Sequence, residues 1–481
     1  MPRLLESFPP ALWLTDGYKW SHSRMEQPGT TNTYSYFESR VGAKFPVTQF
    51  VGLQGLLKRY MEGPVVAMED VLEAEAASLD YFMGARHFDT AMWKTIVEDF
   101  GGRLPLSVRA VPEGLVVPVG NILLDVYATD SRCASLVNFW ESLLTHVWLP
   151  CNTATISWTL RQMFVREFAK TVDDDQAWLI DFMLHDFGYR GAAGTEAAMM
   201  AGSAHLVNFQ GTDTLPAIWY TRKYYNTTAM VGLSVAASEH SIATALGRAG
   251  EFRVTDQLIT NFPSGILSVV SDSYDITAAL DYYCSPVVRT RIKGRDGKFV
   301  VRPDSPRFVG DTAAKQILYI ADRLGGGFGY TVNSKGYKVL NPKVGIIYGD
   351  GLSMEDIIEA VQHLVANGWA ASTCLFGMGG GLLQKHNRDT QRSAFKCAAK
   401  ERAGKWFPVY KEPLDRTKTS KRGLLSLVAD QEKGYQTDQQ EETPLAHDLL
   451  VSVFDEGTLL QDYTFEQVRA NARRPTPWYK P

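Results

Sequence analysis

The sequence has none of the features that mark a secreted, membrane-spanning or disulfide-bonded protein. Its five cysteines show no CxxC spacing, which argues against a disulfide framework and a zinc site. No apolar run approaches the ~18 residues that a membrane span needs, and residues 1–20 lack the continuous apolar core of a secretory signal. We therefore expect a cytoplasmic protein that has no membrane partner.

Positive charge is not in excess either. The formal net charge of −4 argues against a nucleic-acid or anionic-membrane partner. A GxxxxGK[ST] loop is absent, so any nucleotide must be held in another way. The acidic run VDDD (172–175) resembles the acidic pair of one class of ribose-diphosphate enzymes, but a helix-like run precedes it and no Thr-Gly loop follows. We interpret it as a solvated loop.

What the sequence does contain is one pattern repeated between residues 179 and 381. Short apolar runs are each followed by a polar or glycine-rich loop and, in most cases, a helix-like stretch: LIDFML-HDFGYRG, HLVNF-QGTDT, GLSVA-ASEHS, GILSVV-SDSYD, FVV-RPDS, GIIY-GDG and STCLF-GMGGG. Strands that helices cover on both faces read as continuous apolar runs. The pattern predicts an irregular parallel (β/α) barrel, with all the polar loops at the end where barrel enzymes hold their chemistry.

At 481 residues the chain is too long for one hydrophobic core. We expect a barrel domain over 151–384 and a flanking α+β domain built from both chain ends, 1–150 and 385–481. The flanking part contains strand-like runs at 34–37, 106–111, 115–119 and 122–126 and helix-like runs at 51–60, 68–77 and 135–168, the last broken near Pro150. We also predict a β-hairpin over 289–304 that turns at Asp296 and Gly297, and an exposed loop over 431–443.

Two groups of residues suit phosphate binding. In GMGGGLLQK (377–385) the glycines and a following helix N-terminus would let backbone N–H groups approach an anion, although a tight turn is an equal alternative. Arg388 and Lys396, just beyond, favour phosphate. Arg302 and Asp304 share one side of an extended chain and suit a sugar phosphate, with a structural ion pair as the alternative. Asp350 lies between two glycines, where a plain turn is as favoured.

Three further loops carry groups suited to a flat ring. Phe187 and Arg190 in HDFGYRG would stack on the ring and hold a polar group. Asp213 would accept a hydrogen bond from an amide, or else cap the helix that follows. Glu239 and His240 end another strand, and the histidine is either packed or catalytic.

Short segments in the same order along almost the whole chain carry a resemblance: TDGYK, YSYFESR, VGLQ, AVPEG, PVGN, HDFGYRG, SAHLVNFQGTD, EHS, VVSDSYD, RPDS, GDG, GGGLLQK, RD, FKC and GLLSL. Through them the chain resembles the nicotinamide phosphoribosyltransferases, which are type II phosphoribosyltransferases. The resemblance implies transfer of phosphoribosyl from phosphoribosyl pyrophosphate to nicotinamide, with Mg²⁺ present, ATP as a co-substrate through a phosphohistidine, and a homodimer with shared active sites.

The resemblance also implies roles for individual residues. His240 would carry the phosphate, with Glu239 beside it. Phe187 and Tyr18, the latter from the partner subunit, would enclose the ring, and Asp213 would accept from the carboxamide. The other implied binding residues, for amide, ribose, diphosphate, phosphate or metal, are Asp16, Arg40, Arg190, Ser268, Asp272, Arg302, Asp304, Gly349, Asp350, Gly379, Gly380, Arg388, Lys396 and Lys411.

Three positions depart from the family's pattern. Met378 replaces a serine in the glycine loop, Pro306 replaces a glycine after RPDS, and Ala394 replaces a serine two residues before Lys396. They bear on phosphate geometry and ATP coupling. The alternatives are a nicotinate phosphoribosyltransferase and a catalytically retired barrel acting as a binding protein. Asp213 argues against the first because it would face a substrate carboxylate. Retention of Arg302, Asp304 and His240 argues against the second.

Overall fold

The computed structural model describes residues 9–304, 312–349, 351–414 and 419–479. These residues form two compact units. Unit 1 comprises 1–155, 221–228 and 387–481, and unit 2 comprises 156–220 and 229–386. No helix among the described residues is long and apolar enough to cross a membrane.

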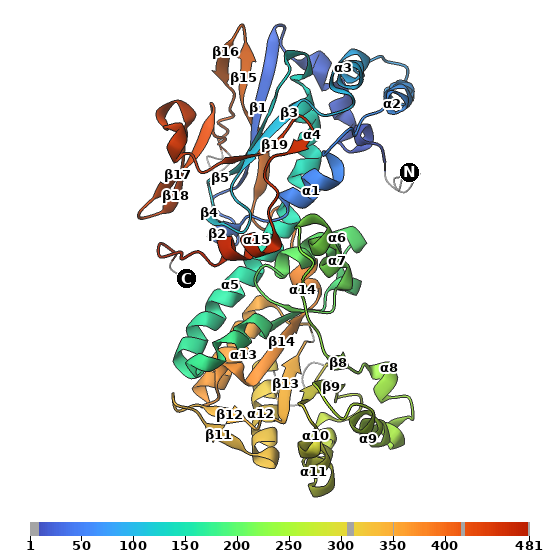
Figure 1. The fold of residues 1–481 in the computed structure, drawn as a ribbon, viewed down its shortest axis with the longest axis vertical. Coiled ribbons are helices and arrows are strands. Elements are labelled where there is room, and N and C mark those ends of the chain that lie inside the picture. Colours follow the sequence, from blue (N-terminus) through green and yellow to red (C-terminus); the bar gives the residue numbers. More distant parts are fainter. Residues whose placement is uncertain (1–8, 305–311, 350, 415–418, 480–481) are drawn as a thin grey trace. The chain divides into compact units, whose positions relative to one another are not determined.

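Unit 2 is built on a seven-stranded parallel sheet (Figure 1). Its strands are β6 (Leu184–Asp186), β7 (Gly211–Thr212), β8 (Ala236–Ala237), β9 (Leu267–Val270), β10 (Phe299–Arg302), β13 (Val344–Tyr348) and β14 (Cys374–Met378). In the order β7-β6-β14-β13-β10-β9-β8, strands that are neighbours in the sheet follow one another in the chain among these seven strands, apart from the β14-β6 pair. Such an order is that of a sheet curling into a barrel.

One segment brings the two edges of this sheet together. Leu233 forms a parallel bridge with Gly211 beside β7, and three residues later the same segment pairs with β9 as β8. The amide of Thr212 donates to the carbonyl of Leu233 at 3.0 Å. The predicted parallel barrel is therefore confirmed, and the loops that follow its strands lie at one end.

Helices cover the sheet of unit 2. They are α6 (Thr195–His205), α8 (His240–Ala243), α9 (Glu251–Asn261), α10 (Ile276–Cys284), α11 (Pro286–Gly294), α12 (Ala313–Phe328), α13 (Met354–Ala366) and α14 (Gly380–Leu383), while α5 (Trp148–Thr171) and α7 (Leu215–Tyr224) span the division between the units. α13 buries Ile357, Val361 and Leu364 at helical spacing. Its capping box on Ser353 and Asp356 fixes where it begins.

Several local predictions were wrong. The segment 286–294 is helix α11, so no hairpin turns at Asp296; instead Asp296 bridges Ser264 in parallel. Of the apolar run 205–209, His205 is the last residue of α6 and residues 206–208 form the buried turn after it, and strand β7 lies in the loop predicted to follow the run. Apolar periodicity does not distinguish a short buried strand from a buried helix end. The break that was predicted near Pro150 in the long helical stretch is confirmed, since α4 ends at Thr145 and α5 begins at Trp148. Pro150 itself lies in the first turn of α5, where a backbone N–H would have no partner within the helix.

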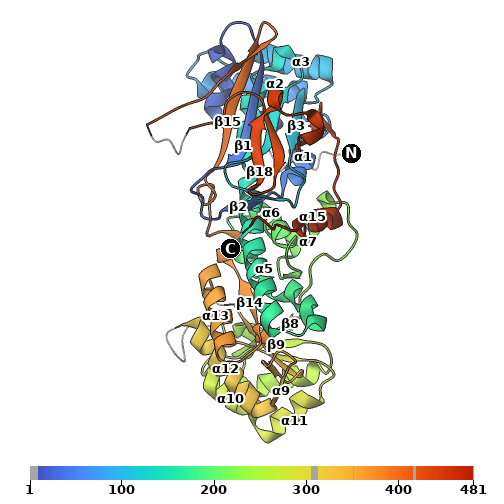
Figure 2. The same ribbon diagram turned by 90° about the vertical axis from the view of Figure 1, so that its left-hand side faces the viewer.

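Unit 1 contains a second seven-stranded sheet, ordered β16-β15-β1-β5-β3-β19-β20 and antiparallel throughout. Its two longest strands, β1 (Thr30–Ser39) and β15 (Ser393–Arg402), come from opposite ends of the chain and lie side by side in both views (Figures 1 and 2). The pairing of the two chain ends confirms the predicted flanking α+β part.

The other strands of unit 1 are β2 (Val47–Gln49), β3 (Leu106–Ala110), β4 (Val116–Pro118), β5 (Ile122–Ala128), β16 (Lys405–Pro408), β17 (Leu425–Asp430), β18 (Gly434–Gln439), β19 (Val451–Asp455) and β20 (Thr458–Leu459). Its helices are α1 (Leu53–Tyr60), α2 (Met68–Tyr81), α3 (Thr90–Phe100), α4 (Leu136–Thr145) and α15 (Phe465–Ala472). Two further strands, β11 (Tyr330–Val332) and β12 (Lys338–Leu340), form a hairpin in unit 2. The exposed loop predicted over 431–443 is wrong, because β18 pairs with β17 there.

Candidate active site

A cavity of about 580 Å³ opens at the ends of the barrel strands of unit 2. It is lined by residues of the loops that follow six of the strands, among them Phe187, Arg190, Asp213, Glu239, Arg302, Asp304, Gly349, Gly379, Gly380 and Lys385. Clefts at this end of a barrel are where ligands bind. The tertiary structure therefore gathers most of the barrel residues that the sequence singled out.

The Phe187 ring owes its place in this cavity to two glycines. A Cβ atom added at Gly377 would overlap the ring, and one added at Gly349 would lie 2.9 Å from it. The amide of Phe187 donates to the carbonyl of Met378 at 3.0 Å, which anchors the loop to β14. These glycines therefore make room for an aromatic ring, a role that the sequence analysis did not assign to them.

Asp213 follows β7 and has an exposed side chain. Its Oδ1 accepts a hydrogen bond from the Ser234 hydroxyl at 2.5 Å, and no described residue is recorded as donating to Oδ2. Helix α7 begins at Leu215, so Thr214 rather than Asp213 directly precedes it, which does not favour the alternative interpretation of Asp213 as its cap. The arrangement leaves one carboxylate oxygen open toward the cavity.

His240 lies between two carboxylates. Its Nε2 is 3.4 Å from Oδ1 of Asp272, and its Nδ1 is 3.6 Å from Oδ2 of Asp304. Asp272 is fully buried and accepts a 2.7 Å hydrogen bond from the amide of Asp304 through its Oδ2. The Glu239 carboxylate, in contrast, accepts from the Ser241 hydroxyl. The acidic neighbours of His240 are therefore Asp272 and Asp304, contributed by loops that lie far apart in the sequence.

Two polar atoms near these residues have no hydrogen-bond partner among the described residues. Nε of Arg302 and Oγ of Ser268 are both buried from solvent and unpaired. Arg302 lies on β10 and Ser268 on the neighbouring strand β9. Since buried polar groups are nearly always paired in a complete structure, these atoms are available to a bound anion or hydroxyl.

The glycine loop 379–381 lies beside the loop that carries Arg190. A Cβ added at Gly191 would lie 3.5 Å from the backbone of Gly380, and Oε1 of Gln384 accepts from the amide of Ala193 at 2.7 Å. The helix that opens here, α14, is only four residues long. The predicted helix is therefore present, but a single turn carries little dipole. The groups that an anion could contact here are mainly backbone N–H groups of the loop and the nearby cations.

Lys385 is a cavity residue that the sequence analysis did not single out. Its exposed side chain lies over the glycine loop, with Cε 4.0 Å from the position of a Cβ at Gly380. The signal was present in the sequence, since Lys385 closes the GMGGGLLQK segment. Together with Arg190 it gives the glycine end of the cavity two positive charges.

The remaining predicted residues gather in unit 1. A second cavity, of about 410 Å³, is lined by Asp16, Tyr18, Arg40, Arg388 and Lys396. Burial lowers the pKa of Lys396, and the nearby positive charges of Arg40, Lys411 and Arg388 lower it further, although Glu141 opposes them. The side chain of Tyr18 is 56% exposed. The structure thus divides the predicted site residues into two groups, one within each unit.

Two of the three positions that depart from the family's pattern lie among the residues that the structure describes. Met378 and Ala394 are both buried, and Met378 ends strand β14 directly before the glycine loop. Pro306 and Asp350 lie outside the described residues. Among the described residues, no group of three or more His, Cys, Asp or Glu side chains is placed to hold a metal ion.

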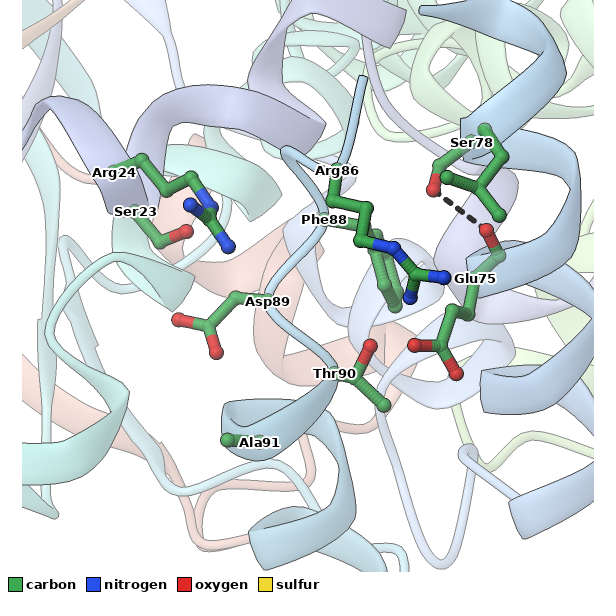
Figure 3. A pocket seen from close by; sticks show the side chains of 10 residues that line it. Ser23, Arg24, Glu75, Ser78, Arg86, Phe88, Asp89, Thr90 and Ala91 are labelled. Atoms are coloured by element: carbon green, nitrogen blue, oxygen red, sulfur yellow. Dashed lines mark hydrogen bonds between the residues drawn. The ribbon is translucent and has the colours of Figure 1, made fainter. Parts of the chain in front are cut away.

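A third cavity, in unit 1, has side chains of both charges in its lining (Figure 3). It is lined by two arginines, Arg24 and Arg86, but also by Glu75 and Asp89, so the charges balance. Asp89 already accepts from the amide of Met92 as the cap of α3. The cavity therefore has no clear preference for an anion.

A sequential parallel barrel with arginine, glycine and paired carboxylates at its rim, joined to an antiparallel α+β unit, defines a phosphoribosyltransferase of type II. Residues 182–457 match the Nicotinate phosphoribosyltransferase (NAPRTase) family, and residues 11–108 match the Nicotinamide phosphoribosyltransferase N-terminal domain. The chain belongs to this family.

Curated relatives agree with this assignment. The chain is 41% identical to a nicotinamide phosphoribosyltransferase of Xanthomonas campestris pv. campestris, over 95% of this chain and 97% of the relative. It is 30% identical to a nicotinamide phosphoribosyltransferase of Acinetobacter baylyi, over 94% and 95%. Among solved structures, human nicotinic acid phosphoribosyltransferase has a TM-score of 0.59 at 16% identity, covering 95% of this chain and 93% of that one, which shows the shared fold.

Proposed function

We propose that this protein is a nicotinamide phosphoribosyltransferase, which transfers phosphoribosyl from phosphoribosyl pyrophosphate to nicotinamide and yields nicotinamide mononucleotide and pyrophosphate. The relatives that match almost the whole chain carry this activity in their names. The observation that supports it most directly is the open Asp213 carboxylate in the same cavity as the Phe187 ring. An aromatic face and a hydrogen-bond acceptor are what a pyridine carboxamide requires.

The chemistry needs orientation and charge stabilisation. The ring nitrogen of nicotinamide attacks the anomeric carbon while the bond to diphosphate breaks, through an oxocarbenium-like transition state. Phe187 would hold the ring in plane, and Asp213 would orient it through the amide. Arg302, with its unpaired Nε, would stabilise the charge on the phosphate groups, while Asp304 would face the positive sugar. Positioned charges of this kind lower the barrier without a covalent intermediate.

Mg²⁺ fits this site as an ion that the diphosphate brings with it. Mg²⁺ commonly binds through one or two carboxylates, several waters and substrate phosphates, rather than in an all-protein cage. Oδ1 of Asp272 is buried and lacks a hydrogen-bond donor among the described residues, although it faces His240. Asp272 and Asp304 would hold the ion near the diphosphate oxygens, where it would neutralise part of their charge.

ATP coupling through His240 is a further part of the proposal. The imidazole lies at the rim between Asp272 and Asp304, and its side chain is 42% exposed. A histidine that is both oriented by carboxylates and accessible suits a phosphoryl acceptor. ATP would donate its terminal phosphoryl group to a ring nitrogen of His240 and leave as ADP.

Nicotinate is the competing substrate. Its carboxylate would meet Asp213, and bringing two like charges together in a partly desolvated cavity costs several kcal/mol. One assay separates the two candidates: pyrophosphate release from phosphoribosyl pyrophosphate with nicotinamide, with nicotinate or with neither, each with and without ATP. We expect pyrophosphate release with nicotinamide. Pyrophosphate release with nicotinate but not with nicotinamide would overturn the proposal.

Lys385 provides a prediction about the phosphate end. We expect Lys385→Ala to raise KM for phosphoribosyl pyrophosphate about tenfold, because a charge-assisted contact contributes roughly 1.5 kcal/mol. KM for nicotinamide should stay unchanged, since Lys385 lies by the glycine loop. Steady-state kinetics with each substrate varied would test this. The exposed Lys293 on α11, which does not line the cavity, provides the control Lys293→Ala; equal KM changes in both variants would contradict the role.

The two groups of site residues support a homodimer with shared active sites. Tyr18 and the cations of the unit 1 cavity would complete the barrel site of a second copy. We expect Tyr18→Ala and Asp213→Ala to be inactive alone and, after subunit exchange, to recover about a quarter of wild-type activity, because half of the dimers are mixed and each keeps one intact site.

The matched control for this mixture uses two variants from the same cavity. A mixture of Phe187→Ala and Asp213→Ala should recover no activity. In each mixed dimer one barrel site lacks Phe187 and the other lacks Asp213, so neither site is intact. Mixed dimers verified by two affinity tags that remain inactive would contradict the shared-site proposal.

A further inference from the structure

Asp186 is a buried carboxylate to which no function has yet been assigned. It ends strand β6, is 0% exposed and does not line the cavity. Burial raises the pKa of Asp186 to about 6, and no described cation pairs with it. A buried carboxylate without a cation is costly, so its hydrogen bonds must hold it in place.

One oxygen of Asp186 fixes the loop that carries Phe187. Its Oδ1 accepts a hydrogen bond from the amide of Gly188 at 2.7 Å. This bond links the two residues that flank Phe187 in the chain. On the other side, the amide of Phe187 is bound to the carbonyl of Met378. The backbone that orients the ring is thus held at both ends.

The other oxygen and the backbone of Asp186 fix the loop that carries Asp213. The Thr212 hydroxyl donates a hydrogen bond to Oδ2 of Asp186 at 3.4 Å and accepts one from the amide of Thr214 at 3.0 Å. These two bonds connect Asp186 to the residues on either side of Asp213. The amide of Asp213 donates directly to the carbonyl of Asp186 at 2.9 Å. Strands β6 and β7 place Asp186 opposite Thr212 in register.

We propose that Asp186 is a positioning residue that sets the spacing between the Phe187 ring and the Asp213 carboxylate, and thereby the affinity for nicotinamide. The inference rests on the proposed function. A pyridine carboxamide is rigid, so its ring and its amide meet both partners only at one separation. Displacements of ~1 Å at such contacts are enough to lower activity substantially.

A second buried carboxylate offers a matched comparison. Glu113 in unit 1 is also almost completely buried, and it accepts from the amides of Gly52 at 2.9 Å and Gln54 at 2.5 Å. It contacts none of the predicted site residues through these bonds. Replacing Glu113 therefore removes a buried carboxylate that, like that of Asp186, accepts hydrogen bonds from backbone amides. It does not change any residue at the rim of the barrel.

The test compares Asp186→Asn and Asp186→Ala with Glu113→Gln by steady-state kinetics and thermal unfolding. We expect the Asp186 variants to raise KM for nicotinamide at least tenfold, by weakening contacts of roughly 1.5 kcal/mol or more, while KM for phosphoribosyl pyrophosphate stays within about twofold. Glu113→Gln should lower the melting temperature and leave both KM values unchanged. Asp186 variants that only melt earlier, with both KM values unchanged, would overturn the inference.

A milder change keeps the test decisive if the Asp186 variants do not fold. Thr212→Val is nearly isosteric and removes the hydroxyl that links Asp186 to the amide of Thr214. It should raise KM for nicotinamide about three- to fivefold in the same selective manner, as expected for one neutral hydrogen bond. An unchanged KM for nicotinamide in folded Thr212→Val would overturn the inference. A wild-type protein that fails to use nicotinamide would instead overturn the proposed function.

Discussion

Asp213→Asn is expected to lower kcat/KM for nicotinamide about 10- to 100-fold, because a hydrogen bond to a charged acceptor contributes roughly 1.5–3 kcal/mol. The same variant should use nicotinate better than the wild type does. An asparagine side chain has an N–H that can donate to the substrate carboxylate, whereas the wild-type carboxylate repels it. The Ser234 hydroxyl can still donate to the Asn carbonyl oxygen, so the side chain stays in place.

Paired kinetics with both substrates, at one fixed concentration of phosphoribosyl pyrophosphate, would measure this change in preference. Asp175→Asn is the control, since Asp175 is exposed in the 172–175 run and lies outside the cavity. If Asp213→Asn kept the wild-type ratio of nicotinamide to nicotinate, Asp213 would not recognise the amide.

His240→Ala is expected to abolish stimulation by ATP and leave a slow basal turnover. The substitution removes the proposed phosphoryl acceptor but leaves Phe187 and Asp213 to bind nicotinamide. It also leaves Asp272 and Asp304 without the imidazole between them. The basal rate should therefore fall somewhat too, because the imidazole no longer separates the two carboxylates.

Initial rates with and without ATP, together with detection of a phosphorylated histidine by mass spectrometry, would test this prediction. His363→Ala on α13 is the control, since His363 is a half-exposed helix residue that does not line the cavity. Full ATP stimulation in the His240→Ala variant would show that phosphoryl transfer does not pass through this residue.

The barrel was predictable because its pattern is repeated seven times and each repeat is read in the same way. Buried parallel strands have no solvated face, so runs such as 299–301 and 345–348 are continuously apolar and were located correctly as β10 and β13. The run 205–209 was wrongly predicted to be a strand, because the buried turn that follows α6 has the same apolar composition as a buried strand. Strand β7, with two residues, is too short to produce any pattern.

The chemistry of the site was predictable to the extent that it lies in single loops. Arg302 and Asp304, or the glycines 379–381, are close in sequence, so their loops could be read directly. The acidic partners of His240 could not be predicted in this way. Glu239 is its sequence neighbour, but Asp272 and Asp304 are the carboxylates within 4 Å of the imidazole.

The sequence by itself determined the fold class, the position of the polar loops at one end of the barrel and, through ordered motifs, the family. These depend on local composition and on the rule that parallel strands place their following loops at the same edge. Only the tertiary structure decided which side chains meet. It placed the Phe187 ring over Gly349 and Gly377, and Asp186 between two loops. Such contacts join strands tens of residues apart, and their distances depend on packing that no local pattern specifies.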